Sequence, residues 1–116
     1  MQDKRHKIIQ FRNVSDSVGQ SCWQPSADVY RGSKGWLVKF DLAGVRPQDI
    51  TLVVDGRRLT VKGIRRDFSV LEQQTAFSME IAYNQFERTI DLPVDIENAR
   101  LTHDYHDGMY LIVIHQ

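Results

Sequence analysis

The stretch GWLVKFDLAGVRPQDITLVVDGRRLTVKG, residues 35–63, decides the fold class. It contains three runs in which apolar and polar residues alternate, at 36–42, 50–55 and 58–62. A period of two with one apolar face is typical of a half-buried β-strand. Asp55-Gly56 supplies a tight hairpin turn between the second and third runs, because glycine readily adopts positive φ. The stretch therefore predicts an antiparallel β scaffold, and no catalytic motif interrupts it.

The same alternation continues on both sides of this stretch. Residues 28–30 predict a short strand before it, and residues 86–93 predict another after it, with Arg88 on the apolar face. Asp107-Gly108 is a second hairpin turn signal, joining 99–105 to 109–114. Short strands separated by turn signals favour an all-β sandwich.

Residues 65–85 are the least regular part of the predicted domain. Phe77, Met79 and Ile81 alternate with smaller or polar residues, which again predicts a strand. The segment is too long for a hairpin loop, where a few residues suffice. A strand carried on such an excursion can pair with its own sheet or with that of a neighbouring chain.

Length and composition indicate one globular domain. The chain has 116 residues and a formal net charge of zero, so electrostatic attraction to nucleic acid or an anionic membrane is not indicated. It has no apolar run of bilayer length and no secretion signal. Cys22 is the single cysteine, which excludes an intrachain disulfide and fits a reducing, cytoplasmic location.

The domain boundaries are predicted at residues 1–22, a flexible N-terminal arm, and 23–116, the sandwich. The arm mixes basic residues with Ile8, Ile9 and Phe11. A mobile arm is the favoured interpretation, because so short a segment forms only a marginal helix. Sticky contacts with other chains are the second interpretation. A nucleic-acid arm is the third, since no basic face or aromatic platform matches it.

The sequence offers no catalytic or metal-binding constellation. His103 and His106 lie three residues apart, so on a strand they point to opposite faces and are poorly placed to share a metal ion. Cys22 has no basic neighbour that would activate a thiol. No nucleophile elbow, phosphate-binding loop or zinc spacing is present. We expect no enzymatic activity, no cofactor and no metal ion.

Five motifs in order resemble the α-crystallin domain of small heat-shock proteins, of the bacterial and plant type. They are WQPSADVY, GWLVKFDLAGV, DITLVVDGRRLTVKG, NQFERTIDLP and HDGMYLIVI, and they span residues 23–114. The chain departs from the family pattern in several places. Ala43 replaces a usual proline, Asn84 stands where glycine is common, and His115-Gln116 replace Pro-Lys.

The resemblance implies an immunoglobulin-like antiparallel β-sandwich and ATP-independent holdase activity toward unfolding proteins. It also implies homodimers, possibly assembling further, in which residues 76–82 of one chain pair with 27–30 of another. The residues implied for this interface are Ala27, Asp28, Val29, Tyr30, Phe77, Met79, Ile81 and Arg88. A peptide groove is implied between two sheet edges, with walls formed by Ile50, Leu52, Val54, Leu101 and His103.

Family members normally carry an Ile-x-Ile tail that fills this groove, and the sequence contains no such tail after Gln116. The expectation is therefore that dimers do not join into large cages by that route. Two alternatives stay open. A CS-type co-chaperone binding one folded partner is disfavoured by the long loop at 65–85. An enzyme carried on a β-sandwich is disfavoured by the missing catalytic constellation.

Overall fold

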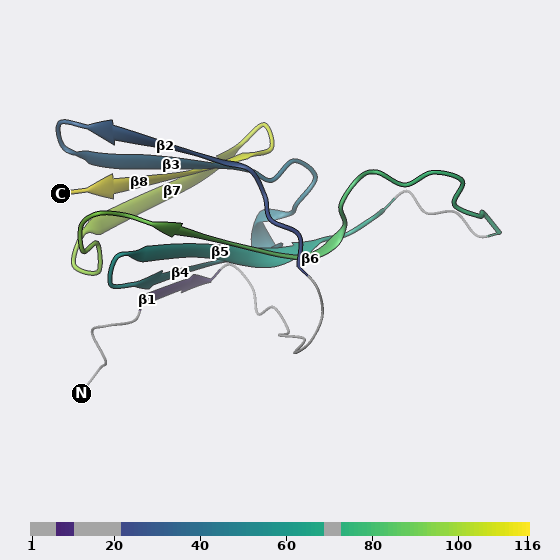
Figure 1. Cartoon of the computed structure of the whole chain (residues 1–116), viewed down its shortest axis with the longest axis horizontal. Helices are drawn as coiled ribbons and strands as arrows, with labels where there is room; N and C mark the ends of the chain where they lie inside the picture. The colour runs from purple at the N-terminus through teal and green to yellow at the C-terminus, as the bar shows by residue number, and fades with distance from the viewer. Residues whose placement is uncertain (1–6, 11–21, 69–72) are drawn as a thin grey trace.

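The computed structural model describes residues 7–10, 22–68 and 73–116, and these form two facing antiparallel β-sheets (Figure 1). The strands are β1 (Lys7–Gln10), β2 (Ala27–Gly32), β3 (Gly35–Asp41), β4 (Ile50–Asp55), β5 (Arg58–Arg65), β6 (Asn84–Asp91), β7 (Arg100–His106) and β8 (Met109–His115). One 3-10 turn, η1 (Pro47–Asp49), precedes β4. The predicted all-β sandwich is confirmed.

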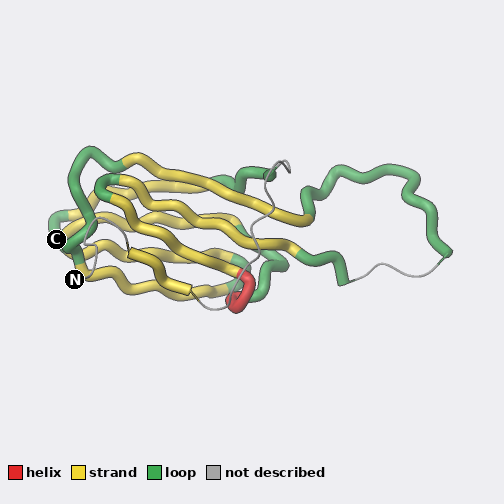
Figure 2. Tube along the Cα trace, turned by 90° about the horizontal axis from the view of Figure 1, so that it is seen from below, coloured by secondary structure: helices red, strands yellow, loops and turns green. Residues whose placement is uncertain are grey.

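The strand order explains which segments lie at the borders of the sandwich. One sheet has the order β1-β4-β5-β6 and the other the order β2-β3-β8-β7. The predicted hairpins β4–β5 and β7–β8 are both present. The described parts of the connection between β5 and β6, residues 66–68 and 73–83, project from one end of the sandwich, as Figure 2 shows.

The core lies between the two sheets and follows the alternation seen in the sequence. Alternate residues of β3 and β8 are fully buried, and their neighbours in sequence lie on the outer face. β4 and β5 supply the opposite wall of the core in the same way. The largest fully buried side chains are Tyr110, Phe40, Phe86, Leu42, Ile50, Leu52, Leu59, Ile96, Ile112 and Ile114.

The two predicted turn signals behave differently. Asp107 and Gly108 both have positive φ, +50° and +82°, as a type I′ hairpin turn requires. In the β4–β5 turn, Asp55 pairs with Arg58, and of the two residues between them only Gly56 has positive φ, +61°. A turn with glycine first is the type II′ pattern, so Asp55 ends the strand rather than occupying the turn.

Two segments differ from what the sequence predicted. Residues 7–10, placed in the flexible arm, form strand β1 against β4, whereas the rest of residues 1–21 lies outside the described residues. Residues 77–82, predicted as a strand, carry no strand in this single chain. The alternation of Phe77, Met79 and Ile81 is real, but a β-ladder also needs a backbone partner, and no described strand pairs with this segment.

Candidate functional site: two sheet edges and a projecting loop

The residues singled out in the sequence lie at four places: strand β4 with β7, strand β2, the loop between β5 and β6, and, for Arg88, strand β6. β2 and β7 end one sheet, and β1 and β6 end the other. An end strand presents backbone N–H and C=O groups that can pair with a further strand. These edges are therefore places where the fold can bind a further extended segment.

β4 is not an end strand, because β1 covers its outer side. Lys7 lies opposite Val54 and Gln10 opposite Thr51 in antiparallel register. The predicted groove residues Ile50, Leu52 and Val54 are each 0% exposed and belong to the core. A peptide at this edge would therefore meet the β4 backbone before it met these side chains.

The β7 residues predicted for the groove also face inward. Leu101 pairs with the buried Ile114 and packs against the core, and it is itself half-buried. His103 is half-buried, and its ring meets the ring of Tyr110 edge-on, with centroids 5.9 Å apart. All five predicted groove residues thus line the inner faces of the two sheets. Their contact with a bound peptide stays a prediction.

β2 is an open edge among the described residues. It pairs with β3 on one side and with no described strand on the other. Ala27 is half-buried, Asp28 is exposed, and Val29 and Tyr30 are 41% and 47% exposed. The ammonium group of Lys39 lies 5.0 Å from the centre of the Tyr30 ring, which holds this ring on the outer face. Three of these four residues predicted for an interface, Asp28, Val29 and Tyr30, are therefore exposed, and Ala27 packs partly against the core.

The projecting loop exposes large apolar side chains. Phe77 is fully exposed, and Met79 and Ile81 are 68% and 65% exposed. Phe68, near the start of the loop, is also exposed. A cluster of exposed apolar side chains on one segment marks an interaction site more often than scattered ones do. The side chains of Phe77, Met79 and Ile81 are therefore accessible for contact with a partner.

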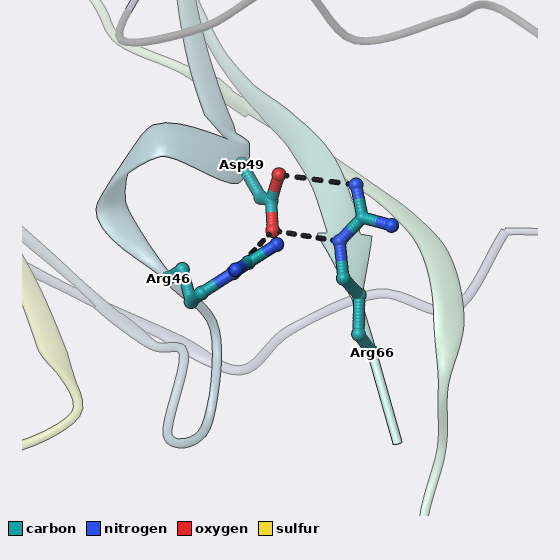
Figure 3. Close-up of polar contacts among 3 residues, drawn as sticks. All are labelled: Arg46, Asp49 and Arg66. Carbon is teal, nitrogen blue, oxygen red and sulfur yellow. Dashed lines mark hydrogen bonds and ion pairs between the residues drawn. The ribbon is translucent and has the colours of Figure 1, made fainter. Parts of the chain in front are cut away.

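A buried carboxylate anchors the start of this loop (Figure 3). Asp49 is 2% exposed and accepts hydrogen bonds from Arg66 at 3.0 and 3.3 Å and from Arg46 at 3.2 Å. Burial raises the pKa of the Asp49 carboxyl, but the two guanidinium groups outweigh that effect and hold the pKa below its usual value. The carboxylate stays charged and ties the residue after β5 to the turn before β4.

The anchor also requires close packing of the backbone. A Cβ on Gly63 would lie 2.0 Å from the carbonyl oxygen of Asp49, so a larger residue on β5 would push η1 away. The guanidinium of Arg46 lies 5.1 Å from the centre of the Phe68 ring and extends the anchor into the loop.

The two ends of the loop are also joined to each other. Arg65 donates a hydrogen bond to the carbonyl of Ala82 at 2.9 Å, and its guanidinium lies 4.2 Å from the centre of the Trp23 ring. The indole N–H of Trp23 donates to the carbonyl of Asn84 at 3.2 Å. Asn84 adopts positive φ, +70°, where glycine would cost least and asparagine is the next best residue. The loop therefore leaves the sandwich from a fixed base.

Arg88 faces the interior, as its place among apolar residues predicted. It is half-buried and donates a hydrogen bond to the carbonyl of Pro25 at 3.0 Å. Backbone hydrogen bonds join Trp23 to Gln85 and Glu87, so the segment before β2 runs along the edge of β6. Arg88 thus braces the segment that leads into β2. Ion pairing of Arg88 across a dimer stays a prediction.

Sequence reasoning missed β1 and the Asp49 anchor. Two adjacent isoleucines between Lys7 and Gln10 give no alternation that would predict a strand. Asp49 and Arg66 are 17 residues apart, and nothing in the sequence marks them as partners. Among the described residues no group of three or more His, Cys, Asp or Glu side chains is placed to hold a metal ion. No helix in the described part is long and apolar enough to cross a membrane.

Comparison with solved structures first defines the class of domain. The sandwich superposes on heat shock protein 16.0 from Schizosaccharomyces pombe with a TM-score of 0.71 at 24% identity, covering 80% of this chain and 86% of that one. It matches a small heat-shock protein from Xylella fastidiosa with a TM-score of 0.67 at 26% identity, covering 83% and 88%. The fold is that of an α-crystallin domain.

The sequence comparison then shows the family. The profile of the Hsp20/alpha crystallin family matches residues 28–116, and the chain belongs to this family. Small heat shock protein C2 of Rickettsia felis is 27% identical over 90 residues, which cover 78% of this chain and 58% of that protein. The chain therefore spans less than two thirds of the length of this relative.

Proposed function

We propose that the protein is an ATP-independent chaperone, a holdase that binds unfolding proteins before they aggregate. Membership of a family whose relatives are named small heat shock proteins is the observation that carries this proposal. The exposed apolar side chains of the loop and the open β2 edge support it, because unfolding proteins expose extended apolar segments. We expect no catalytic activity.

Capture of this kind needs no nucleotide. A client that binds the chaperone leaves the pool of aggregating molecules by mass action, and the binding equilibrium alone protects it. The partners of the protein are then unfolding proteins of many sequences, because backbone pairing at an edge requires an extended strand rather than a particular side chain. A cytoplasmic location remains part of this proposal.

The proposed assembly is a homodimer formed by exchange of loop strands. Residues 76–82 of one chain would pair with 27–30 of the other. This pairing would give the loop segment a backbone partner and β2 a second neighbour beside β3, neither of which a described strand provides. The exposure of Val29 and Tyr30 and of Phe77, Met79 and Ile81 supports this pairing. The CS-type adaptor is the second candidate, and the projecting loop at 66–83 disfavours it.

Light scattering measures the aggregation of a heat-labile client protein and so tests the proposed activity. The client is heated in the absence of ATP, once with the chain present and once without it. We expect suppression at a stoichiometric ratio of chain to client. A variant with Phe77→Ser, Met79→Ser and Ile81→Ser should suppress less, whereas Ser78→Ala with Glu80→Gln, on the same loop, should match the wild type. Unchanged scattering at a stoichiometric dose would rule out the holdase. Tight binding of one folded protein without suppression would favour the adaptor.

A further inference from the structure

The sheet β2-β3-β8-β7 carries a hollow beside the turn that joins β2 to β3. Its volume is about 410 Å³, which lies within the range of small-molecule sites, roughly 300–1,000 Å³. The hollow lies where this turn meets the end of β8, and Figure 1 shows both at the same end of the sandwich. The proposed function leaves this hollow without a role.

The floor of the hollow is apolar and is built by three neighbouring strands. Tyr30 lies opposite Leu37, and Leu37 lies opposite Val113, in antiparallel register. These three side chains share the outer face of the sheet, because the adjacent residues Val38 and Ile114 are buried in the core. Leu37 and Val113 are only half-buried. A ligand in the hollow would therefore remove further apolar surface from water, which favours binding.

One end of the hollow is cationic. Lys34 lies in the exposed turn between β2 and β3, and its carbonyl accepts a hydrogen bond from the backbone N–H of Gln116 at 2.9 Å, which fixes the turn. Lys34 and Arg31 both line the hollow, and neither forms an ion pair with a described residue. The guanidinium of Arg31 lies 5.7 Å from the centre of the Trp36 ring, a contact that leaves its charge without a counter-anion.

The opposite end of the floor has a different charge pattern. Two residues further from the turn, Asp28 lies opposite Lys39, and on the far side of the sheet Asp104 lies opposite Leu111. Carboxylates therefore occur beyond the apolar floor, and cations occur beside the turn. A ligand with one anionic group gains energy when that group points toward Lys34 and loses it when the ligand is reversed. The charges thus select both the sign and the orientation of a ligand.

We propose that this hollow binds a compact amphipathic carboxylate, a small molecule with an apolar body and one carboxylate group. The apolar body covers Leu37 and Val113, and the carboxylate pairs with Lys34, with Arg31 as the second cation. A neutral or positively charged molecule with the same body matches the floor of the hollow but not its cationic end. The inference does not rest on the proposed function, because it requires neither a client nor a dimer.

Saturation-transfer NMR of 4-tert-butylbenzoate with the full chain tests the proposal, because this measurement observes the ligand and works for an assembly of any size. A ligand of this size should bind with a dissociation constant on the order of 1 mM. Its neutral counterpart, 4-tert-butylbenzamide, should bind about threefold more weakly, since an exposed charge pair contributes modestly. The cation 4-tert-butylbenzylammonium should bind most weakly. Equal affinity for the three probes would overturn the proposal, because it would indicate general adhesion to apolar surface.

Surface variants place the binding in this hollow. Arg31→Gln with Lys34→Gln should weaken binding of the benzoate about threefold and leave binding of the benzamide unchanged, so the preference for the carboxylate disappears. Leu37→Ser should weaken binding of both probes about fivefold, because it removes part of the floor. Arg57→Gln with Arg58→Gln is the matched control, since it removes two exposed cations beside the β4–β5 turn of the other sheet. A preference that survives the first variant, or is lost in the control, would contradict the site.

A second copy of the chain is the competing occupant, because Tyr30 also belongs to the β2 edge proposed for the dimer. The variant Phe77→Ser with Met79→Ser and Ile81→Ser removes the apolar face of the loop and should bind the benzoate as the wild type does. Tighter binding in this variant would show that the loop of a second copy fills the hollow, and would overturn the proposal. None of these measurements uses a client protein, so their outcome is independent of whether the chain suppresses aggregation.

Discussion

The β4 edge and the β2 edge belong to the same sandwich, but they differ in whether another strand of the chain covers them. β4 is covered along four residues by β1 of the same chain. β2, at the end of the opposite sheet, pairs with no described strand on its outer side and exposes Val29 and Tyr30. One edge therefore has a partner within the chain, and the other has no neighbour on its outer side among the described strands.

The difference shows that two edges of one sandwich can have different neighbours and can therefore take part in different interactions. An uncovered edge is a liability in an isolated protein, since it pairs with any exposed strand. The short strand β1 covers most of the β4 edge and so limits pairing with other chains there. In the proposed dimer, the β2 edge pairs with the exposed loop segment 76–82 of a second copy of the chain. The predictions below test whether the two edges are independent.

The largest effect is expected at the loop. Replacing Phe77, Met79 and Ile81 with serine removes the apolar face that we expect to be buried in the dimer. Each such side chain contributes roughly 1.5 kcal/mol or more when fully buried, so even partial burial predicts a dimer dissociation constant raised at least about 100-fold. Sedimentation equilibrium measures the change.

The variant with Ser78→Ala and Glu80→Gln is the control for this experiment, because it alters the other face of the same segment. Dimerisation should be retained there. A dimer that survives all three serine substitutions would show that the chains associate elsewhere, and the β2 edge would lose its proposed role.

A smaller effect is expected at the anchor of the loop. Asp49→Asn removes a buried carboxylate that receives hydrogen bonds from Arg46 and Arg66. Both arginines are partly exposed, so solvent weakens the pairs, and the loss of unfolding free energy should be about 1–2 kcal/mol. Urea denaturation measures it. Asp91→Asn is the matched control, because its pair with Arg58 is exposed and should contribute less than about 0.5 kcal/mol.

The contribution of Asp49 should depend on pH with a definite sign. Its pKa is lower in the folded protein than in the unfolded chain, so the carboxylate stabilises the fold at pH values above the unfolded pKa, about 3.9. The stability difference between the wild type and Asp49→Asn should be constant from about pH 5 to 8 and shrink as the pH falls below about 4. A difference that grows toward acid would contradict the anchor.

The smallest effect on stability is expected for β1. The variant Ile8→Pro with Ile9→Pro removes one four-residue strand from the end of a sheet and leaves the core residues of β4 in place. The unfolding free energy should fall by about 1 kcal/mol or less, because few net hydrogen bonds are lost. A loss of several kcal/mol in urea denaturation would mean that β1 contributes far more to the stability of the sandwich than its four paired residues account for.

The strands of the sandwich were predictable because their signal is local. The alternation of apolar and polar residues predicts which residues of β3, β4, β5 and β8 face the core. Glycine predicts the position of each of the two hairpin turns. The place of Arg88 on an apolar face followed from the same alternation.

The partners of those strands were not predictable in the same way. The alternation of Phe77, Met79 and Ile81 indicated a strand, but a strand also needs a neighbour, and none of the described strands pairs with this segment. The pairing of β1 with β4 joins residues more than forty positions apart without any periodic signal. The ion pair of Asp49 with Arg66 depends on the fold that brings η1 beside β5. Local patterns define elements, and only the fold defines which edges stay open.

Hydrogen exchange of the β2 and β4 amides, followed as the protein concentration rises, tests the independence of the two edges most directly. The β2 amides that point away from β3 should become protected with increasing concentration, as a second copy pairs with them. Protection of the β4 amides that point away from β5 should be independent of concentration and lost only in Ile8→Pro with Ile9→Pro. Protection of β2 that ignores concentration, or protection of β4 that follows it, would contradict the assignment of an outside partner to β2 and an internal one to β4.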